Sequence, residues 1–329
     1  MIGFAVLGCG RIGRMHARNI RSHPRADLVS CYDIVSKAAE DTARELGAKA
    51  AGSINDVFSD RRVQAVLIAS STDTHVDLIT RSVKAGKAAL CEKPIDLDMG
   101  RVDGCWREIG GLHPMLMIGF NRRFDPSFQT LRDRIQAGEI GNLEQVVITS
   151  RDPEPPPAHY IPHSGGLFRD MTIHDFDMAR YLAGEIVEVQ AIGANLVDPA
   201  IGELGDIDSA MVLLRAAGGA LVHINNSRRC AYGYDQRIEV FGGKGMLQAR
   251  NRHPNTIEFW GDGWTHARDP LMTFFVERYR DAYNAEIEYF VDCLENGREP
   301  VPGFADGREA LRLADAALES LRAGKAVKL

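Results

Sequence analysis

The feature that most constrains the fold of this chain is a glycine-rich turn close to its start. Residues 2–7 form a nearly continuous apolar run, as expected for a strand buried on both faces of a parallel sheet. The run ends in Gly8, and Gly10 and Gly13 complete the spacing GxGxxG. A helical pattern and a second strand pattern, residues 27–33, follow. Together these elements predict a βαβ unit that binds a dinucleotide, whereas the glycine spacing alone would be a weak signal.

Each residue of this turn has a predicted physical role. Gly8 permits the tight turn, Gly10 lets the backbone approach a pyrophosphate, and Gly13 lets the helix pack closely on the strand. Asp33 lies about 20 residues further on, where a carboxylate accepts hydrogen bonds from ribose hydroxyls and repels a 2′-phosphate, so NAD is favoured over NADP. The alternative is an ordinary glycine-rich turn with a surface aspartate. The predicted cofactor site includes Gly8, Gly10, Arg11, Ile12, Gly13 and Asp33.

Alternating strand and helix patterns continue to about residue 120 and predict a doubly wound α/β domain, residues 1–119. Strands are expected at 63–69, 88–91 and 115–120, and helices at 36–46, 73–84 and 98–109. Ligands bind outside the carboxyl ends of such strands, which favours cofactor contacts from Ser70, Thr72 and His75 after the strand at 63–69. Capping of the next helix is an equally good explanation for Thr72 and Asp73.

A second strand exit, after residues 88–91, carries Glu92, Lys93 and Pro94. We assign Glu92 and Lys93 to the cofactor side of the site. The Lys93 ammonium could orient a substrate hydroxyl or tune a proton relay there. A solvated loop lysine is the alternative.

After residue 119 the pattern changes, which predicts a second domain, residues 120–329, with a large, mostly antiparallel open sheet. Strands are expected at 143–150, 186–196, 208–214, 219–227, 237–241, 246–248 and 256–259, and long helices at 274–294 and 305–321. One face of the sheet is expected to carry helices, and the other to pair between subunits. At the junction, Arg123 is a candidate substrate ligand, although a salt bridge joining the domains is at least as good an explanation.

Residues 165–182 contain the second cluster of ionisable groups. If a helix begins near Asp170, then Asp170 and His174 share one face, and the carboxylate can orient the imidazole as a general base. A helix cap and a partly buried histidine are the alternatives. Tyr234 could supply a hydroxyl to a polyol, or simply pack at a strand end. No second His/Cys cluster completes a ligand set, so we expect no metal.

The charge balance and the cysteines limit the partners. The 39 Lys plus Arg against 45 Asp plus Glu give a net charge of −6, so no basic field exists to gather nucleic acid, and a small-molecule partner is expected. Six scattered cysteines without paired spacing are typical of a cytosolic chain. No apolar run is long enough to span a bilayer, and the N-terminus lacks the pattern of a signal peptide.

Five segments, residues 8–13, 91–95, 119–125, 168–177 and 232–237, give the chain a specific resemblance. It resembles the Gfo/Idh/MocA oxidoreductase family along its whole length, and within it the bacterial inositol 2-dehydrogenases. The resemblance implies a tetramer that oxidises a secondary ring hydroxyl with NAD, usually of myo-inositol to 2-keto-inositol. It implies that Lys93, Asp170 and His174 form the catalytic group, with Arg123 and Tyr234 near the substrate.

Two other functions remain open at this stage. The first is a dehydrogenase of another inositol stereoisomer, such as scyllo- or D-chiro-inositol, or of an aldopyranose such as glucose. The second is a non-catalytic sensor of NAD(H), against which the presence of Lys93, Asp170 and His174 argues.

Overall fold

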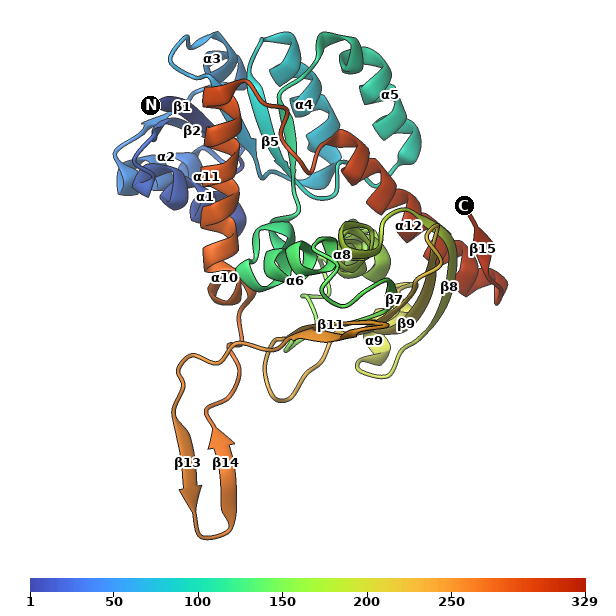
Figure 1. The fold of residues 1–329 in the computed structure, drawn as a ribbon. Helices are drawn as coiled ribbons and strands as arrows, with labels where there is room; N and C mark the ends of the chain where they lie inside the picture. Colours follow the sequence, from blue (N-terminus) through green and yellow to red (C-terminus); the bar gives the residue numbers. More distant parts are fainter. The chain divides into compact units, whose positions relative to one another are not determined.

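The chain folds into two compact units, each built from two segments (Figure 1). The computed structural model describes residues 1–329. Unit 1 contains residues 1–121 and 283–311, and unit 2 contains residues 122–282 and 312–329. These ranges differ from the expected 1–119 and 120–329 because a late segment of the chain packs with the N-terminal residues.

Unit 1 is organised around a six-stranded parallel sheet with strand order β3-β2-β1-β4-β5-β6. This order is the one found in dinucleotide-binding Rossmann folds, with the order reversing between β1 and β4. The predicted doubly wound parallel sheet is therefore confirmed. The strands are β1 (Ile2–Leu7), β2 (Ala26–Tyr32), β3 (Lys49–Ala50), β4 (Ala65–Ile68), β5 (Ala88–Glu92) and β6 (Leu116–Gly119).

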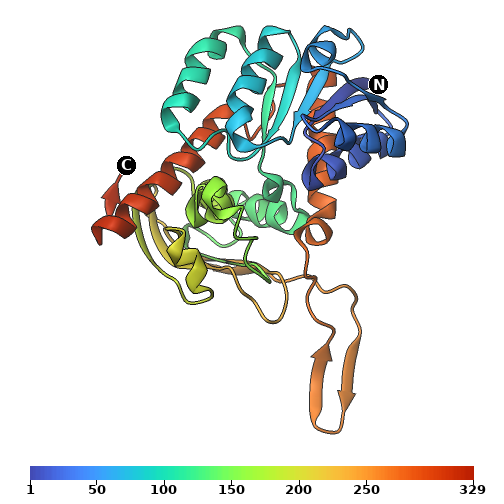
Figure 2. The same ribbon diagram turned by 180° about the vertical axis from the view of Figure 1, so that it is seen from behind.

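Helices of unit 1 connect successive strands, and each buries one apolar stripe. In α1 (Arg11–Ser22) the buried stripe includes Met15, His16 and Ile20. Since right-handed crossovers run one way from β1 and the other way from β4, the helices lie on both faces of the sheet (Figure 2). The others are α2 (Ser36–Leu46), α3 (Ile54–Ser59), α4 (His75–Lys84) and α5 (Met99–Ile109), with 3₁₀ turns η1 (Thr72–Thr74) and η2 (Gly110–Leu112).

The late segment completes the core of unit 1. In α11 (Arg280–Asn296), the ring of Phe290 lies 6.1 Å from that of Phe4. In α12 (Phe304–Ala323), Phe304 stacks on Trp106 at 4.8 Å between ring centroids. These contacts bury surface of the sheet and of α5.

Unit 2 is built on a seven-stranded sheet with strand order β12-β11-β7-β10-β9-β8-β15. Only β10 and β7 pair in parallel, which confirms the expected mostly antiparallel sheet. Its strands are β7 (Leu143–Arg151), β8 (Ile186–Ala194), β9 (Ser209–Ala216), β10 (Leu221–Ser227), β11 (Asp235–Gly242), β12 (Gly245–Ala249) and β15 (Val327–Lys328).

Burial alternates along the strands of this sheet. In β9, Ala210, Val212 and Leu214 are buried, whereas Met211 and Leu213 are exposed. Helices α6 (Pro126–Gln136) and α8 (Ile173–Ala183) pack on the sheet, and Figure 1 shows them on the same side of it. The remaining short helices are α7 (Ile161–Ser164), α9 (Pro199–Glu203) and α10 (Phe275–Arg278), with the turns η3 (Asn121–Phe124) and η4 (Phe168–Thr172).

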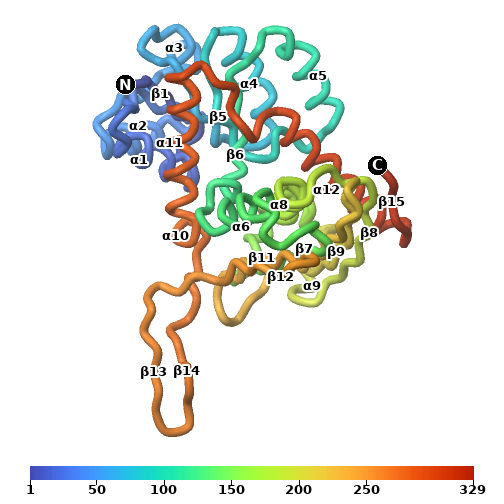
Figure 3. The backbone as a smooth tube through the Cα atoms, viewed as in Figure 1, coloured from blue at the N-terminus to red at the C-terminus, as the bar shows by residue number.

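One predicted strand, at residues 256–259, does not join this sheet. β13 (Glu258–Gly261) instead pairs with β14 (Trp264–Arg268) in a separate hairpin that extends away from the sheet of unit 2 (Figure 3). Three of its aromatic side chains, Phe259, Trp260 and Trp264, are exposed. The prediction that this strand joins the large sheet was wrong, because an alternation of apolar and polar residues identifies a strand but not the strand with which it pairs.

The helix expected over 274–294 is divided into α10 and α11 at Tyr279. The Tyr279 ring packs edge-on against Tyr234, and its hydroxyl donates to Gln236 Oε1 at 3.2 Å. The preceding Arg278 is buried and donates to Asp125 Oδ2 at 2.6 Å. These tertiary contacts interrupt a helix that local propensity favours. None of the helices combines the length and the apolar character needed to cross a membrane.

We expect Phe290→Ala to lower the free energy of unfolding by about 3–5 kcal/mol, since it removes a fully buried ring from the core of unit 1. The control is Leu112→Ala, because Leu112 of the same unit is 56% exposed and its truncation leaves no cavity. Denaturant unfolding measures both. Equal effects of the two substitutions would contradict the assignment of α11 to the core of unit 1.

Candidate active site

The glycine turn between β1 and α1 has the geometry expected from the sequence. Gly8 has a φ of +96°, and a Cβ there would lie 2.5 Å from the carbonyl oxygen of Ala69. A Cβ at Gly13 would lie 1.8 Å from the carbonyl oxygen of Gly8, so only glycine lets α1 approach β1 this closely. The structural roles predicted for Gly8 and Gly13 are thus confirmed.

The start of α1 leaves room for a ligand. A Cβ at Gly10 would meet no atom within 4 Å. Gly10 is the N-cap of α1 and provides no side-chain hydrogen bond, so the first N–H groups of the helix are available to an anion. Of the next two residues, Arg11 is exposed and Ile12 half-buried.

Asp33 stands directly after β2 and holds the glycine turn. Its Oδ2 accepts from the backbone N–H of Cys9 at 2.6 Å, and its Oδ1 from that of Val35 at 2.8 Å. Each carboxylate oxygen can still accept a further hydrogen bond, as a ribose would require. Ile34 and Val35, which sequence reasoning missed, follow with 90% and 60% exposure. Exposed aliphatic side chains beside Asp33 are candidates to contact an adenine ring.

Ser70, Thr72 and His75 lie beyond the end of β4. Thr74, not Thr72 or Asp73, is the N-cap of α4, and it makes no side-chain capping bond, so the capping explanation was wrong. Ser70 Oγ instead bonds Thr74 Oγ1 at 2.6 Å.

His75 is buried between two strand exits. Its Nδ1 lies 2.8 Å from the carbonyl oxygen of Pro94, and its Nε2 lies 3.1 Å from that of Ser70. Burial lowers the pKa of His75, so the ring is neutral and has one N–H, which we assign to Nδ1 from the shorter distance. His75 therefore ties the backbone next to Lys93 to the exit of β4.

On the other side of Lys93, Glu92 is held by a second buried histidine. His16 Nε2 lies 2.7 Å from Glu92 Oε1. A Cβ at Gly119 would lie 3.1 Å from Glu92 Oε2, so the absence of a side chain at the end of β6 leaves space for this carboxylate. Lys93 is half-buried. The residue before it, Glu92, is held by His16, and the residue after it, Pro94, is held by His75.

In unit 2, Asp170 and His174 lie on one continuous helical segment. The π-helical turn η4 contains Asp170 and runs directly into α8, whose second residue is His174. Residues four apart in such a segment lie on the same side, and π-turns inside helices are frequent at functional sites. Asp170 Oδ2 accepts from Arg228 at 3.2 Å, and Oδ1 accepts from the hydroxyl of Tyr160 at 3.1 Å.

A buried polar network fixes α8 on the sheet. Arg122 donates to Asp175 Oδ1 at 2.5 Å, and Asn226 donates to Asp175 Oδ2 at 2.8 Å. Thr172 donates to Asn226 Oδ1 at 2.8 Å. Burial raises the pKa of Asp175, and the Arg122 charge opposes that shift. His174 is therefore flanked by two residues, Thr172 and Asp175, that are bound to the sheet.

The other two predicted substrate ligands make contacts inside unit 2. Arg123 donates to both carboxylate oxygens of Asp177, at distances from 2.6 to 3.1 Å, and both residues are buried. Tyr234 is buried at the start of β11 with its ring centroid 6.0 Å from that of Tyr279. These contacts explain the burial of Arg123 and Tyr234, and their roles toward a substrate stay predictions.

Sequence reasoning missed Asp152 and Arg228. Arg228 is only 1% exposed and bonds Asp170. Asp152 follows β7, and burial raises its pKa to about 6, reinforced by the Asp170 charge and opposed by that of Arg228. Its position two residues after the strand predicted at 143–150 was the signal that could have identified it. A carboxyl that titrates near neutral pH beside Asp170 is a candidate to bind hydroxyl groups.

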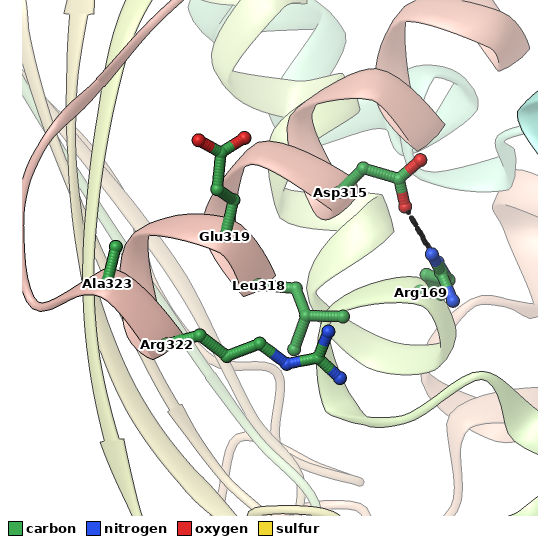
Figure 4. A pocket seen from close by; sticks show the side chains of 6 residues that line it. All are labelled: Arg169, Asp315, Leu318, Glu319, Arg322 and Ala323. Carbon is green, nitrogen blue, oxygen red and sulfur yellow. Dashed lines mark hydrogen bonds and ion pairs between the residues drawn. The ribbon is translucent and has the colours of Figure 1, made fainter.

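A separate pocket of about 430 Å³ lies on unit 2 against α12 (Figure 4). Arg169 from η4 donates to Asp315 there at 2.8 Å, and Leu318, Glu319, Arg322 and Ala323 complete the lining. None of the predicted catalytic side chains lines this pocket, so we do not assign the substrate to it. The structure contains no group of three His, Cys, Asp or Glu side chains arranged to hold a metal ion.

Comparisons with known proteins agree with this geometry. A family model described as an oxidoreductase family with an NAD-binding Rossmann fold matches residues 2–120, and one described as the GFO/IDH/MocA C-terminal domain matches residues 128–248. Inositol 2-dehydrogenase of Rhizobium meliloti is 50% identical over 97% of this chain and 97% of its own length.

Solved structures are also similar over the whole chain. A myo-inositol dehydrogenase from Corynebacterium glutamicum is 49% identical, with a TM-score of 0.98 over 100% of this chain and 99% of that one. Scyllo-inositol dehydrogenase from Lactobacillus casei, with bound NAD(H) and scyllo-inositol, is 28% identical, with a TM-score of 0.91 over 100% and 99%.

These matches define the class of protein. The chain belongs to the Gfo/Idh/MocA family of oxidoreductases, and the resemblance seen in the sequence is confirmed. Its first unit carries the NAD-binding Rossmann fold of that family. The open space at Gly10, the uncapped start of α1 and the remaining acceptor capacity of Asp33 fit this cofactor.

Gly10 and Gly13 should respond oppositely to alanine. Gly13→Ala is expected to lower the free energy of unfolding by about 1–3 kcal/mol, because its Cβ meets a backbone oxygen. Gly10→Ala is expected to leave stability within about 0.5 kcal/mol of wild type and to weaken NADH binding about tenfold, since its Cβ occupies the space open to a pyrophosphate. Denaturant unfolding and NADH fluorescence titration check the pair. Unchanged NADH affinity in Gly10→Ala would refute the assigned phosphate position.

Proposed function

We propose that the protein oxidises a secondary ring hydroxyl of an inositol with NAD, converting myo-inositol to 2-keto-myo-inositol (scyllo-inosose). The observation that carries this proposal is the 50% sequence identity, over 97% of this chain, to a protein named inositol 2-dehydrogenase. The presence of Lys93, Asp170 and His174 supports it further, because a non-catalytic NAD(H) sensor would not need all three.

His174 is the proposed general base. Its imidazole accepts the proton of the substrate hydroxyl while the hydrogen on the same carbon departs as hydride, so a ketone forms. The Lys93 ammonium donates a hydrogen bond to the oxygen as negative charge develops on it, which lowers the barrier electrostatically. When bound, NAD supplies the hydride acceptor.

Asp170 is the proposed partner of His174. A carboxylate one turn before the histidine orients the ring and stabilises the imidazolium formed in the reaction. The Arg228 and Tyr160 contacts fix the Asp170 carboxylate in turn. Arg123, Asp152 and Tyr234 are proposed to bind the other hydroxyl groups of the ring. Asp33 is proposed to accept from the adenosine ribose and to favour NAD over NADP.

His174→Ala is expected to lower kcat by about 10²–10⁴-fold, the range that general acid–base catalysis contributes, with little change in NADH affinity. The control is His113→Asn. His113 precedes β6 and so stands at the amino end of this parallel strand, whereas the predicted site residues follow the carboxyl ends of strands. Asparagine tolerates the φ of +49° at this position. Initial rates of NADH formation measure both. Near-normal turnover by the His174→Ala enzyme would refute the assignment of His174 as the general base.

A substrate panel tests the proposed reaction itself. Myo-, scyllo- and D-chiro-inositol and glucose are offered with NAD or NADP, and NADH or NADPH absorbance is followed. We expect myo-inositol with NAD to give the highest kcat/KM. A higher value for another ring would reassign the substrate within this class, and no turnover of any polyol would contradict the proposed reaction and favour the non-catalytic NAD(H) sensor.

We also propose that the protein is a homotetramer that associates through the sheet of unit 2. Ile192 and Met211 lie directly opposite each other in register on β8 and β9, and they are 70% and 57% exposed. Phe241 and Met246 form a similar exposed pair on β11 and β12. Apolar side chains of neighbouring strands on one face favour burial against another copy.

Light scattering after size-exclusion chromatography tests this association. The wild-type mass is expected to be four times that of the 36.2 kDa chain. The double substitution Ile192→Glu with Met211→Glu places carboxylates on the exposed face and is expected to give a smaller species. A control double glutamate substitution at Ile34 and Val35, which are also exposed but lie on unit 1, should leave the mass unchanged. An unchanged mass in the Ile192/Met211 variant would contradict the proposed interface.

The cysteines support a proposal about compartment. All six are buried and none forms a disulfide. Burial raises the pKa of the Cys91 thiol, so it packs as an apolar group. We propose on this basis that the protein works in the reducing cytoplasm.

A further inference from the structure

Three ionisable side chains from three elements of unit 1 are linked near the end of β5, two by a hydrogen bond and the third through the charge of Glu92. His16 comes from α1, Glu92 from the end of β5, and Glu286 from α11. His16 and Glu286 are fully buried, and the side chain of Glu92 is 14% exposed. His16 Nε2 donates to Glu92 Oε1 at 2.7 Å, and the Tyr283 ring packs edge-on against His16 at 5.4 Å between centroids.

Glu286 is the unusual member of this cluster. Neither of its carboxyl oxygens has a hydrogen-bond partner, although the side chain is fully buried. An ionised carboxylate without donors in such a place is strongly disfavoured. Burial, and after it the Glu92 charge, raise the pKa of Glu286 well above its usual range. Burial without donors therefore favours the uncharged carboxylic acid form of Glu286.

The neutral form of Glu286 leaves a single carboxylate beside His16. Glu286 and Tyr283 are three residues apart on α11 and so lie on the same side of the helix. Tyr283 packs on the imidazole that binds Glu92, and Glu92 is the charged group that acts on Glu286. A second negative charge at position 286 would repel Glu92.

Lys93 is the residue next to this cluster in the chain. Glu92 is its immediate neighbour, and the Glu92 side chain lies between His16 and the bare backbone of Gly119. Glu92 and Lys93 share a peptide bond, so a displacement of the Glu92 backbone also displaces the backbone from which the Lys93 side chain projects. Buried polar atoms without partners are rarely kept by chance, and they concentrate at functional sites.

We propose that Glu286 is a positioning residue for Lys93, acting as a neutral acid that keeps the Glu92 carboxylate on His16 and so fixes the lysine at the strand exit. This inference rests on the proposed role of Lys93 in catalysis. Ionisation of Glu286 then releases the Glu92–His16 contact and sets an alkaline limit on activity.

The test compares wild type with Glu286→Gln, which has the same shape and stays uncharged at every pH. The control is Glu288→Gln, two residues further along α11, where an exposed carboxylate pairs with His23 and Arg25. Lys93 is followed without turnover, by its rate of reaction with an amine-directed reagent at each pH, read by mass spectrometry. Steady-state kcat and KM are measured over the same pH range.

In wild type and in Glu288→Gln, kcat is expected to fall about tenfold per pH unit above the pKa of Glu286, with a matching inflection in Lys93 labelling. In Glu286→Gln, kcat at neutral pH is expected to stay near wild type, and both the alkaline fall and the inflection move to higher pH. Identical alkaline profiles in wild type and Glu286→Gln would overturn the proposal. If no polyol is oxidised, the proposed function fails, whereas Lys93 labelling still decides the role of Glu286.

Thermal unfolding gives an independent check on the charge state. The pKa of Glu286 is raised in the folded protein, so the folded state loses stability relative to the unfolded chain as pH rises from about 4.3, the unfolded value, to the raised folded value. The melting temperature of Glu286→Gln should therefore exceed that of wild type by a margin that grows with pH across this window. A constant margin would show that Glu286 is already ionised and would overturn the proposal even if the variant is inactive.

Discussion

The close approach of Gly13 to the carbonyl oxygen of Gly8 is the constraint on which unit 1 depends. It brings α1 against β1, and the open start of that helix then faces the space beyond Gly10. The same placement sets His16, one turn further along α1, within reach of Glu92 at the end of β5. A single backbone contact that only glycine allows thus determines both the phosphate-facing turn and the position of the strand exit that carries Lys93.

Unit 2 positions its ionisable groups differently, through buried ion pairs instead of backbone contacts. Arg122 binds Asp175 and Arg123 binds Asp177, two residues apart on α8. Loss of one partner of such a pair leaves an uncompensated buried charge, at a cost of about 3–5 kcal/mol. The helix that carries His174 is therefore held at two nearby residues, and its N-cap residue Thr172 adds a third attachment by donating to Asn226. Rigid support of this kind is what a base needs to meet a hydroxyl in one geometry.

Local features of the sequence predicted much of this arrangement, and long-range features did not. The glycine turn, the strand exits at Ser70 and Glu92, and the helix containing His174 all follow from short patterns whose physics is local. The partners of Arg122 and Arg123 lie more than fifty residues away, so the sequence could only suggest a salt bridge without naming it. Glu286 looked like one more polar position of an amphipathic helix. The environment of its side chain depends on which surface α11 covers, and the spacing of apolar residues along a helix does not identify that surface.

Unit 1 is closed by a segment made late in synthesis. Residues 283–311 supply Phe290 against Phe4, and the carbonyl oxygen of Pro302 accepts from the backbone N–H of Ile118 in β6. On the ribosome, the parallel sheet therefore emerges with part of its apolar surface uncovered and waits until nearly the whole of unit 2 has followed. The cofactor-binding unit therefore begins before unit 2 in the chain but is completed only after residues 122–282 have been synthesised, and unit 2 is completed in turn by residues 312–329.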